Sequence, residues 1–267
     1  MILTRQRLGV FRYVLYGHAA LVAAFLLLPI VFIAALSFGS SRWLAFPPPA
    51  WTTKWYAELA GDPRWAQSAW LSFRLALTVM ALSVLLGGGA AFALWRVKFR
   101  GRALLKAFFI APMIVPVVIL AIALYAFSLR LGLAGTFVGF VIGHLTIALP
   151  FSVICIGNAL QSFDGTLEQA AAICGASRFQ TLWRVTLPSI AIGIFAAAVF
   201  SFLASWDEVV ISIFMASPQL QTLPVKMWTS LRMDLTPVIA AASTLLVLVS
   251  LLVMAGFGLV MLRRNAK

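Results

Sequence analysis

The sequence has few charged side chains and very few acidic ones. Only 10% of its 267 residues are charged, 7 of them acidic, and 63% are hydrophobic. Soluble domains have roughly 25% charged and 45–50% apolar residues. A soluble protein of this length would need many more polar residues to cover its surface. The composition therefore excludes an ordinary soluble domain and predicts an integral membrane protein.

The sequence also lacks the residue patterns of common catalytic and nucleotide-binding sites. It contains no Gly-x-x-x-x-Gly-Lys-Ser/Thr phosphate-binding loop and no His-Glu-x-x-His zinc motif. The histidines, His18 and His144, lie singly in different apolar segments, and the cysteines are Cys155 and Cys174. We expect no disulfide and no metal site from residues so spaced. The chain is therefore predicted not to be an enzyme and to hold no cofactor or metal of its own.

Long apolar runs are abundant. A helix of about 20 apolar residues crosses the hydrocarbon core of a bilayer, and runs of at least this length occur at about 14–38, 69–95, 105–129, 136–160, 188–216 and 238–262. We therefore predict an all-α, polytopic membrane protein with six transmembrane helices. The prediction treats residues 1–267 as a single transmembrane domain.

The formal net charge of +13 is explained by topology rather than by a nucleic-acid partner. Basic residues near short loops resist translocation, so their distribution sets the orientation of the chain. With a cytoplasmic N-terminus, most of the 20 basic residues fall on the inside: Arg5, Arg7, Arg12, Arg96, Lys98, Arg100, Arg102, Lys106, Arg178, Arg184, Arg263, Arg264 and Lys267. The charge pattern predicts that both termini are cytoplasmic, and it provides no single basic face for nucleic acid.

Two patterns predict irregularities inside the apolar runs. Pro112 and Pro116 release carbonyl groups from helical hydrogen bonding and predict a kink near the cytoplasmic end of the third run. Gly87, Gly88 and Gly89 carry no side chain, so they permit close packing of a neighbouring helix, and a hinge is the alternative.

One polar segment interrupts the apolar pattern. Within the loop 161–187, the stretch LEQAAAICGASRFQTLWRVTLPSI predicts a helix that begins with a capping box of Thr166 and Gln169. Gly175 is suited to the left-handed turn that ends a helix, and Ser177 with Gln180 forms a second capping box. The expected structure is a pair of short helices joined by a glycine elbow, the second helix at about 178–186 leading to Pro188 as an early residue of the fifth span.

Spacing alone leaves two interpretations of this helical hairpin. The alanines at 170–172 give the first helix a smooth surface that fits a cleft of another protein. An interfacial amphipathic hairpin would instead hold a set of apolar residues against lipid. These residues are Leu167, Ile173, Phe179, Leu182 and Trp183.

The spacing Gln169-Ala170-Ala171, three residues, Gly175, nine residues, then Val185-x-Leu187-Pro188 resembles the EAA loop of the permease subunits of bacterial ABC importers. In that family the loop forms a coupling helix that docks in a groove of the ATPase subunit. The resemblance implies a coupling role for Glu168, Gln169, Ala170, Ala171, Gly175, Ala176, Ser177, Leu187 and Pro188. The sequence departs from the family at Gln169, where the family usually has glutamate.

Further segments resemble the second permease of the spermidine/putrescine type, and the similarity covers about residues 10–264. The segments are FRGRALLKAFFIAPMIVPVVIL, SFLASWDEVVISIFMASP and LPVKMWTSLRMDLTPVIAAASTLLVL. The resemblance implies the type I ABC importer permease fold and a place in the bacterial inner membrane. It also implies a homologous second permease, two cytoplasmic ATPase subunits that bind ATP and magnesium, and an external substrate-binding protein. Permeases for opines, amino-acid derivatives and ferric iron share these segments and remain alternatives.

Asp207 and Glu208 lie in the fifth apolar run, where ionisable residues are costly and usually face a water-filled cavity or the bundle interior. Their carboxylates are suited to ammonium groups, and Trp206 and Trp228 add aromatic faces that attract cations. We expect these four residues to line or gate the substrate path. The alternative is a structural ion pair with a basic residue such as Arg232.

Two other functional classes are less well supported. A secondary transporter or channel would work without an ATPase, but the sequence shows no paired broken spans carrying coupling-ion groups. A membrane enzyme would need a nucleophile with a base, or a metal cluster, and neither pattern occurs.

Overall fold

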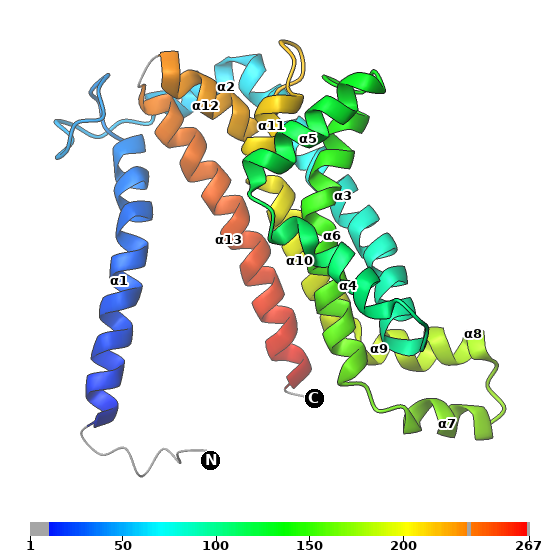
Figure 1. The fold of residues 1–267 in the computed structure, drawn as a ribbon. Coiled ribbons are helices and arrows are strands. Elements are labelled where there is room, and N and C mark those ends of the chain that lie inside the picture. The colour runs from blue at the N-terminus through cyan, green and yellow to red at the C-terminus, as the bar shows by residue number, and fades with distance from the viewer. Residues whose placement is uncertain (1–10, 234–235, 266–267) are drawn as a thin grey trace. The chain divides into compact units, whose positions relative to one another are not determined.

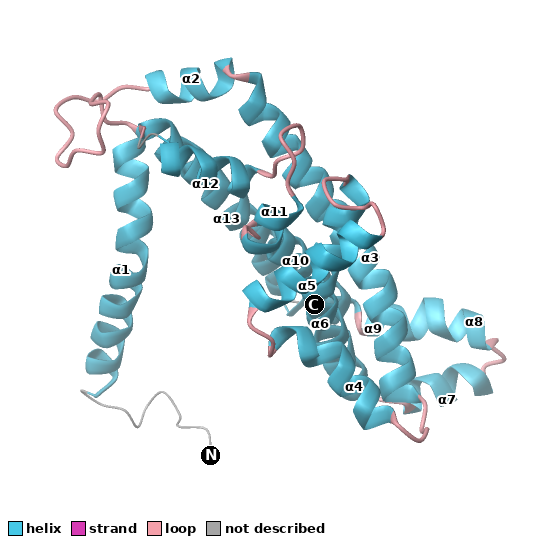
Figure 2. Ribbon diagram, turned by 45° about the horizontal axis from the view of Figure 1, so that its top comes forward, coloured by secondary structure: helices cyan, strands magenta, loops and turns pink. Residues whose placement is uncertain are grey.

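The computed structural model describes residues 11–233 and 236–265, and within these ranges every regular element is helical (Figure 2). The elements are α1 (Phe11–Ser37), α2 (Lys54–Gly61), α3 (Pro63–Arg96), α4 (Arg102–Ile110), η1 (Ala111–Met113), α5 (Val117–Arg130), α6 (Phe137–Gln161), α7 (Thr166–Ile173), α8 (Arg178–Thr181), η2 (Leu182–Thr186), α9 (Leu187–Ser189), α10 (Ala191–Trp206), α11 (Val210–Met215), α12 (Leu223–Met233) and α13 (Pro237–Asn265). Part of the predicted orientation depends on basic residues that lie outside the described residues, namely Arg5, Arg7 and Lys267. The orientation of the chain stays a prediction.

The chain divides into two compact units. One comprises Met1–Asp62 with Ser230–Val247, and the other comprises Pro63–Thr229 with Leu248–Lys267. In the first unit, the loop after α1 returns to the end of that helix: the Trp55 Nε1–H donates to the Gly39 carbonyl at 2.5 Å, and the Tyr56 and Ser37 hydroxyls lie 2.7 Å apart. The second unit contains the polar hairpin and most of the buried core, so it carries the candidate sites.

The core of the second unit is formed where α3, α6 and α10 pack together (Figure 1). Residues with little or no side chain occupy the contacts. A Cβ atom added to Gly87 would lie 2.6 Å from the Ser152 Cβ, and one added to Gly193 would approach Ala159 as closely. α3 runs unbroken through its three glycines, and the contact at Gly87 is the close packing that the sequence predicts.

Three serine hydroxyls join the same helices. Ser83 of α3, Ser152 of α6 and Ser201 of α10 are fully buried, and their oxygens lie 2.8–3.0 Å from one another. A hydroxyl buried in an apolar environment is stable only when it finds a hydrogen-bond partner. The serine cluster therefore fixes the mutual register of the three helices.

Among the residues that the structure describes, four helices are long and apolar enough to cross a membrane: α1, α3, α6 and the part of α13 from Pro237 to Met261. Two further candidates are bent pairs, Arg102–Met113 with Val117–Arg130 at 101°, and Arg178–Ser189 with Ala191–Trp206 at 67°. The count of six spans therefore depends on whether each bent pair forms one span, and it stays a prediction.

The third and fifth apolar runs are each divided between separate helices. The kink expected from Pro112 and Pro116 is present but much sharper, because the chain leaves helical geometry between η1 and α5. Pro188 lies in the last turn before the 67° bend, and its place as an early residue of the fifth span stays a prediction. That run is interrupted again at residues 207–209, between α10 and α11.

The glycine contacts generate a matched pair of substitutions. We expect Gly87→Ala to destabilise the protein by about 1–3 kcal/mol, because its Cβ meets Ser152 in a packed interface. Gly89→Ala, in the same turn of α3, meets no atom within 4 Å and should be neutral or slightly stabilising. The thermal unfolding midpoints of the purified variants in detergent measure both effects. Equal midpoints would show that the helices separate easily at Gly87.

Candidate functional site

The polar segment forms a hairpin at one end of the second unit. α7 and α8 lie side by side beyond the end of α6 (Figure 1), and the same arrangement is visible in the turned view of Figure 2. The second helix runs through α8, a π-helical turn at η2 and α9 before the chain bends into α10. The predicted hairpin of two short helices is therefore confirmed, and its second helix extends to Ser189 rather than to residue 186.

The first helix begins differently from the prediction. Thr166 is already inside α7, Gly165 is the residue before it, and no side chain caps the helix at that position. The capping box of Thr166 and Gln169 is therefore wrong. The acceptor at the start of α7 is instead Asp164, two residues before Thr166. Its Oδ1 accepts the Thr166 backbone N–H at 2.9 Å. That hydrogen bond lowers the pKa of Asp164.

The elbow and the second cap are confirmed. Gly175 has φ of +81°, a conformation that favours glycine. The Ala176 N–H donates to the Ala171 carbonyl and the Gly175 N–H to the Ala172 carbonyl, each at 3.0 Å, which is the hydrogen-bond pattern of a Schellman motif. Ser177 and Gln180 form the predicted capping box, with distances of 3.3 and 2.8 Å.

One carboxylate attaches this hairpin to the helix bundle. Glu168 of α7 accepts two hydrogen bonds from the guanidinium of Arg96, the last residue of α3, at 2.7 and 2.6 Å. The hydroxyl of Thr186, in η2, donates to the same carboxylate at 2.5 Å. We name these three residues the Glu168 clamp. It joins the end of α3 to both helices of the hairpin.

The electrostatics of the clamp favour an ionised carboxylate. Partial burial acts to raise the pKa of Glu168, but hydrogen bonds from Arg96 and Thr186 and the positive charge of Arg96 outweigh burial, so the pKa is lowered. A bidentate pair of this kind is stronger and more directional than a single hydrogen bond. Sequence reasoning missed the clamp, because Arg96 and Glu168 are 72 residues apart and only a conserved pairing across relatives would signal the contact.

The other residues implied by the resemblance occupy different faces of the hairpin. Gln169 and Ala170 are exposed on α7, whereas Ala171 and Ala176 are half-buried. Leu187 packs against the buried cluster around Ile190, and Pro188 is exposed. Gln169 therefore faces away from the clamp, although it is adjacent to Glu168 in sequence.

Most of the apolar side chains of the hairpin are exposed. Ile173 is 88% exposed, Phe179 70% and Trp183 56%, and the rings of the last two lie 5.9 Å apart. Leu167 is exposed and Leu182 is half-buried. Exposed apolar side chains grouped in this way are typical of a surface that another protein or a lipid headgroup layer covers.

The second candidate site is the interruption between α10 and α11. Asp207 is exposed, but Glu208 is buried, with 8% of its surface accessible. The Glu208 carboxylate accepts the backbone N–H groups of Ile211 and Ser212 at 2.8 and 2.9 Å. Glu208 therefore caps the first turn of α11, a position that suits a negative charge.

A buried histidine reinforces this turn. The two ring nitrogens of His144 lie 2.8 Å from the hydroxyls of Ser205 and Ser212, and Nε2 is 3.7 Å from the Glu208 carboxylate. His144 thus links α6 to both sides of the interruption. The two adjacent acids differ in environment: Glu208 belongs to the packed interior, whereas Asp207 is exposed.

The two tryptophans predicted beside these acids are placed differently. Trp206 is buried and its ring stacks on Phe202, with centroids 5.9 Å apart, whereas Trp228 of α12 is 41% exposed. Participation of the four predicted residues in a substrate path stays a prediction. So does an ion pair with Arg232.

The chain resembles proteins of one transport family over most of its length. Residues 83–266 match the family model described as binding-protein-dependent transport system inner membrane component. The spermidine/putrescine transport system permease protein PotC of Escherichia coli K12 is 32% identical over 88% of this chain and 89% of its own length. The putrescine transport system permease protein PotI of the same organism is 30% identical over 83% of this chain and 81% of its own length.

A solved structure extends the similarity to the fold. A chain of a bacterial ABC transporter involved in the import of the acidic polysaccharide alginate superposes with a TM-score of 0.70, at 17% sequence identity, over 96% of this chain and 97% of its own. The all-helical fold is thus that of an ABC importer permease. With the family match over residues 83–266, it follows that this chain belongs to the family of binding-protein-dependent transport system inner membrane components.

Proposed function

We propose that the chain is one permease subunit of an ATP-driven, binding-protein-dependent importer of polyamines such as spermidine and putrescine, or of a related amine. The observation that carries the transport mechanism is the Glu168 clamp, because it joins a projecting helical hairpin to the end of α3. The identities of 32% and 30% to two polyamine permeases support the substrate class. An importer of another solute, such as an opine, an amino-acid derivative or ferric iron, is the alternative.

The partners follow from the same proposal. A homologous second permease completes the translocation path, two cytoplasmic ATPase subunits bind ATP and magnesium, and an external binding protein delivers the substrate. The chain itself has no phosphate-binding loop in its sequence, so ATP hydrolysis belongs to the ATPase subunits. Copurification tests this assembly: a detergent-extracted complex without an ATPase, together with uptake that continues without ATP, would contradict it.

The clamp provides a direct mechanical connection. ATP binding closes the ATPase dimer and displaces the hairpin that docks on it. Through Glu168 and Arg96 the displacement reaches α3, and through η2 and α9 it reaches α10. Since α3, α6 and α10 are packed through glycine and serine contacts, they move as one body. Nucleotide therefore shifts the spans between inward-open and outward-open states by binding the two states unequally.

The acid of the clamp yields a sharp prediction. Glu168→Gln should lower the uptake coupled to ATP hydrolysis roughly tenfold, because loss of a charge-assisted pair costs about 1.5–3 kcal/mol. Gln169→Glu, which adds the acid that the family usually has, should leave folding unchanged because residue 169 is exposed. Uptake per ATP hydrolysed in reconstituted vesicles measures the effect. The double variant Glu168→Gln/Gln169→Glu carries the same net charge as the wild type, but it should not recover the uptake per ATP hydrolysed. Recovery would show that the net charge of α7 matters and that the geometry of the clamp does not.

The elbow yields a second prediction. Gly175→Ala should impair coupled uptake, because a Cβ in the left-handed conformation costs about 1–2 kcal/mol and distorts the turn. Gly175→Asn should retain more activity, since asparagine tolerates this conformation. Gly165→Ala, in the same hairpin but with φ of −63° and open space around it, is the matched control. The measurement is uptake together with stimulation of ATPase activity. Unimpaired coupling in Gly175→Ala would show that the glycine elbow is not needed for coupling.

The two adjacent acids yield a third prediction. Asp207→Asn should reduce amine uptake with normal expression and stability, because Asp207 is exposed at the helix interruption. Glu208→Gln should instead lower thermal stability by about 1–3 kcal/mol, since one amide group cannot accept both backbone N–H bonds equally well. Unfolding and uptake assays separate the two effects. Unchanged amine uptake in Asp207→Asn would favour a purely structural role or a different solute.

A further inference from the structure

The segment that follows α3 combines basic and apolar side chains on its surface. It comprises a turn at residues 97–101 and the helix α4, and we name residues 97–110 the basic segment. Its cations are Lys98, Arg100, Arg102 and Lys106. Three of these side chains are exposed, and that of Arg102 is half-buried. The segment begins directly after Arg96, the residue of α3 that belongs to the Glu168 clamp.

The positive charge of the basic segment is not balanced by acids near it in the sequence. No acidic residue occurs between Asp62 and Asp164. Within the described residues, none of the four cations forms an ion pair with a carboxylate. The Lys106 ammonium lies 4.6 Å from the centroid of the Trp95 ring, a contact that holds the cation in place without neutralising it. The charge therefore remains open to an anion from outside the chain.

The helix α4 separates its apolar and basic side chains onto two faces. Leu104 and Phe108, four residues apart and so on one face, are 77% and 69% exposed. Arg102 and Lys106, also four residues apart, share another face. The helix packs beside α3 and α6 (Figure 1). A basic face combined with an exposed apolar face is typical of a helix that lies in a membrane interface.

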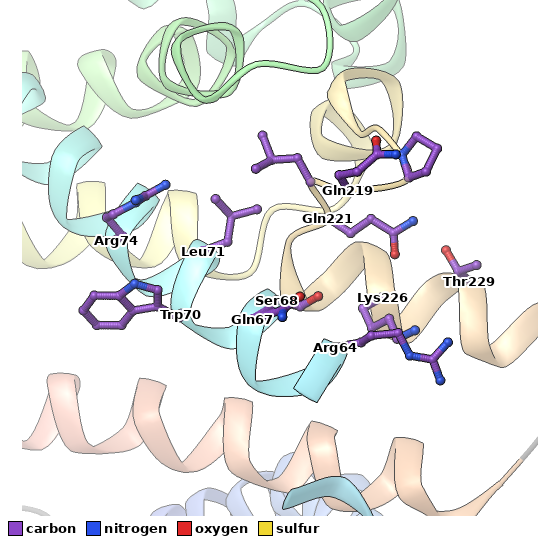
Figure 3. Close-up of a pocket in the computed structure, with 12 residues that line it drawn as sticks. Arg64, Gln67, Ser68, Trp70, Leu71, Arg74, Gln219, Gln221, Lys226 and Thr229 are labelled. Atoms are coloured by element: carbon purple, nitrogen blue, oxygen red, sulfur yellow. The ribbon is translucent and has the colours of Figure 1, made fainter. Parts of the chain in front are cut away.

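The basic residues near the other end of α3 have different surroundings. Arg64 and Arg74 line a cavity of about 490 Å³ together with Lys226 and three glutamines, and most of the lining residues are polar. Figure 3 shows these side chains beside the loop before α12. The basic segment instead presents its cations next to exposed apolar side chains. A phospholipid with an anionic headgroup is the complementary partner, because it joins a negative phosphate to hydrocarbon chains.

We propose that the basic segment binds anionic phospholipid of the cytoplasmic leaflet, with its cations on the phosphates and with Leu104 and Phe108 among the acyl chains. No side chain caps the start of α4, so its first backbone N–H groups can also donate to a phosphate oxygen. Lipid bound in this way anchors the end of α3 on which the Glu168 clamp acts.

Only part of this inference rests on the proposed function. Arg96 contacts the hairpin, so the hairpin and the basic segment lie at the same end of α3, and the proposed docking of the hairpin on cytoplasmic ATPases assigns that end to the cytoplasmic leaflet. An effect of the lipid on coupling rests on the proposed function as well. The binding of anionic lipid does not.

The test uses the complete importer reconstituted in phosphatidylcholine vesicles. The probe is Leu104→Trp, whose fluorescence is quenched by bromine on the acyl chain of a lipid that contacts it, and the importer without this substitution gives the background of the other tryptophans. Brominated phosphatidylglycerol or brominated phosphatidylcholine is then added in increasing amounts. The phosphatidylglycerol should reach half-maximal quenching at a mole fraction about tenfold lower, because basic groups at an interface attract anionic lipid.

Three variants in the same Leu104→Trp importer separate charge from position. Lys98→Gln/Arg100→Gln removes two exposed cations and should raise the required mole fraction of phosphatidylglycerol at least fivefold. Lys98→Arg/Arg100→Lys keeps both charges and should stay within about twofold of the starting importer. Arg42→Gln/Arg130→Gln removes two exposed cations outside the basic segment and should also leave the preference unchanged.

Four results would overturn the proposal. The first is equal quenching by the two brominated lipids before any charge is removed. The second is no quenching by either lipid, because protein would then cover Leu104. The third is a preference that persists in Lys98→Gln/Arg100→Gln. The fourth is loss of the preference in millimolar inorganic phosphate at constant ionic strength, which would indicate a site for a free anion.

The effect on coupling is measured separately, as spermidine uptake per ATP hydrolysed. Uptake should rise about threefold when unbrominated phosphatidylglycerol is added to the wild-type importer, and it should not rise in Lys98→Gln/Arg100→Gln. If quenching shows binding but uptake ignores the lipid, the binding site is confirmed and its role in coupling is wrong. If the wild type transports no spermidine, the proposed function is wrong, whereas quenching still decides whether the basic segment binds anionic lipid.

Discussion

Close approach of α3, α6 and α10 is the constraint on which the rest of the second unit depends. Helices in a bilayer gain no hydrophobic free energy by associating, so they rely on close packing and on hydrogen bonds between them. Gly87 and Gly193 remove the bulk that would separate the helices, and Ser83, Ser152 and Ser201 close a hydrogen-bonded cluster between them. The unbroken α3 then carries Arg96 at one end and Arg64 near the other. The clamp is attached to the packed helices because Arg96 belongs to this unbroken helix.

Local signals in the sequence predicted well, and contacts between distant residues did not. The glycine elbow and the capping box of Ser177 and Gln180 were predictable because each depends on residues within one turn. The same local reasoning failed at Thr166, where Asp164 supplied an acceptor from outside the assumed box. It also underestimated the prolines at 112 and 116, since hydropathy reports an apolar run whether or not the helix continues. The Glu168 clamp required three-dimensional structure, because it brings together residues from separate elements.

A shift of one position along α7 changes what an acid does. Successive helical residues point about 100° apart, so Glu168 faces α3 while Gln169 faces away from it. The acid at position 168 is neutralised within the chain by Arg96. The neutral amide at position 169 leaves the outward face of α7 with its alanines and exposed apolar side chains. On this helix, the intramolecular attachment and the face proposed to meet the ATPase are therefore separate, and the departure from the family pattern at residue 169 does not weaken the attachment.

The same division applies to the helix interruption before α11. A break in a membrane helix leaves backbone N–H groups without partners, and an unpaired group in an apolar environment is costly. Glu208 accepts two of these groups and His144 holds the adjacent serines, so the break is stable without any ligand. Asp207 is exposed, and the capping of α11 does not use its carboxylate. The proposed substrate path therefore combines two adjacent acids of different kinds, one satisfied within the protein and one exposed.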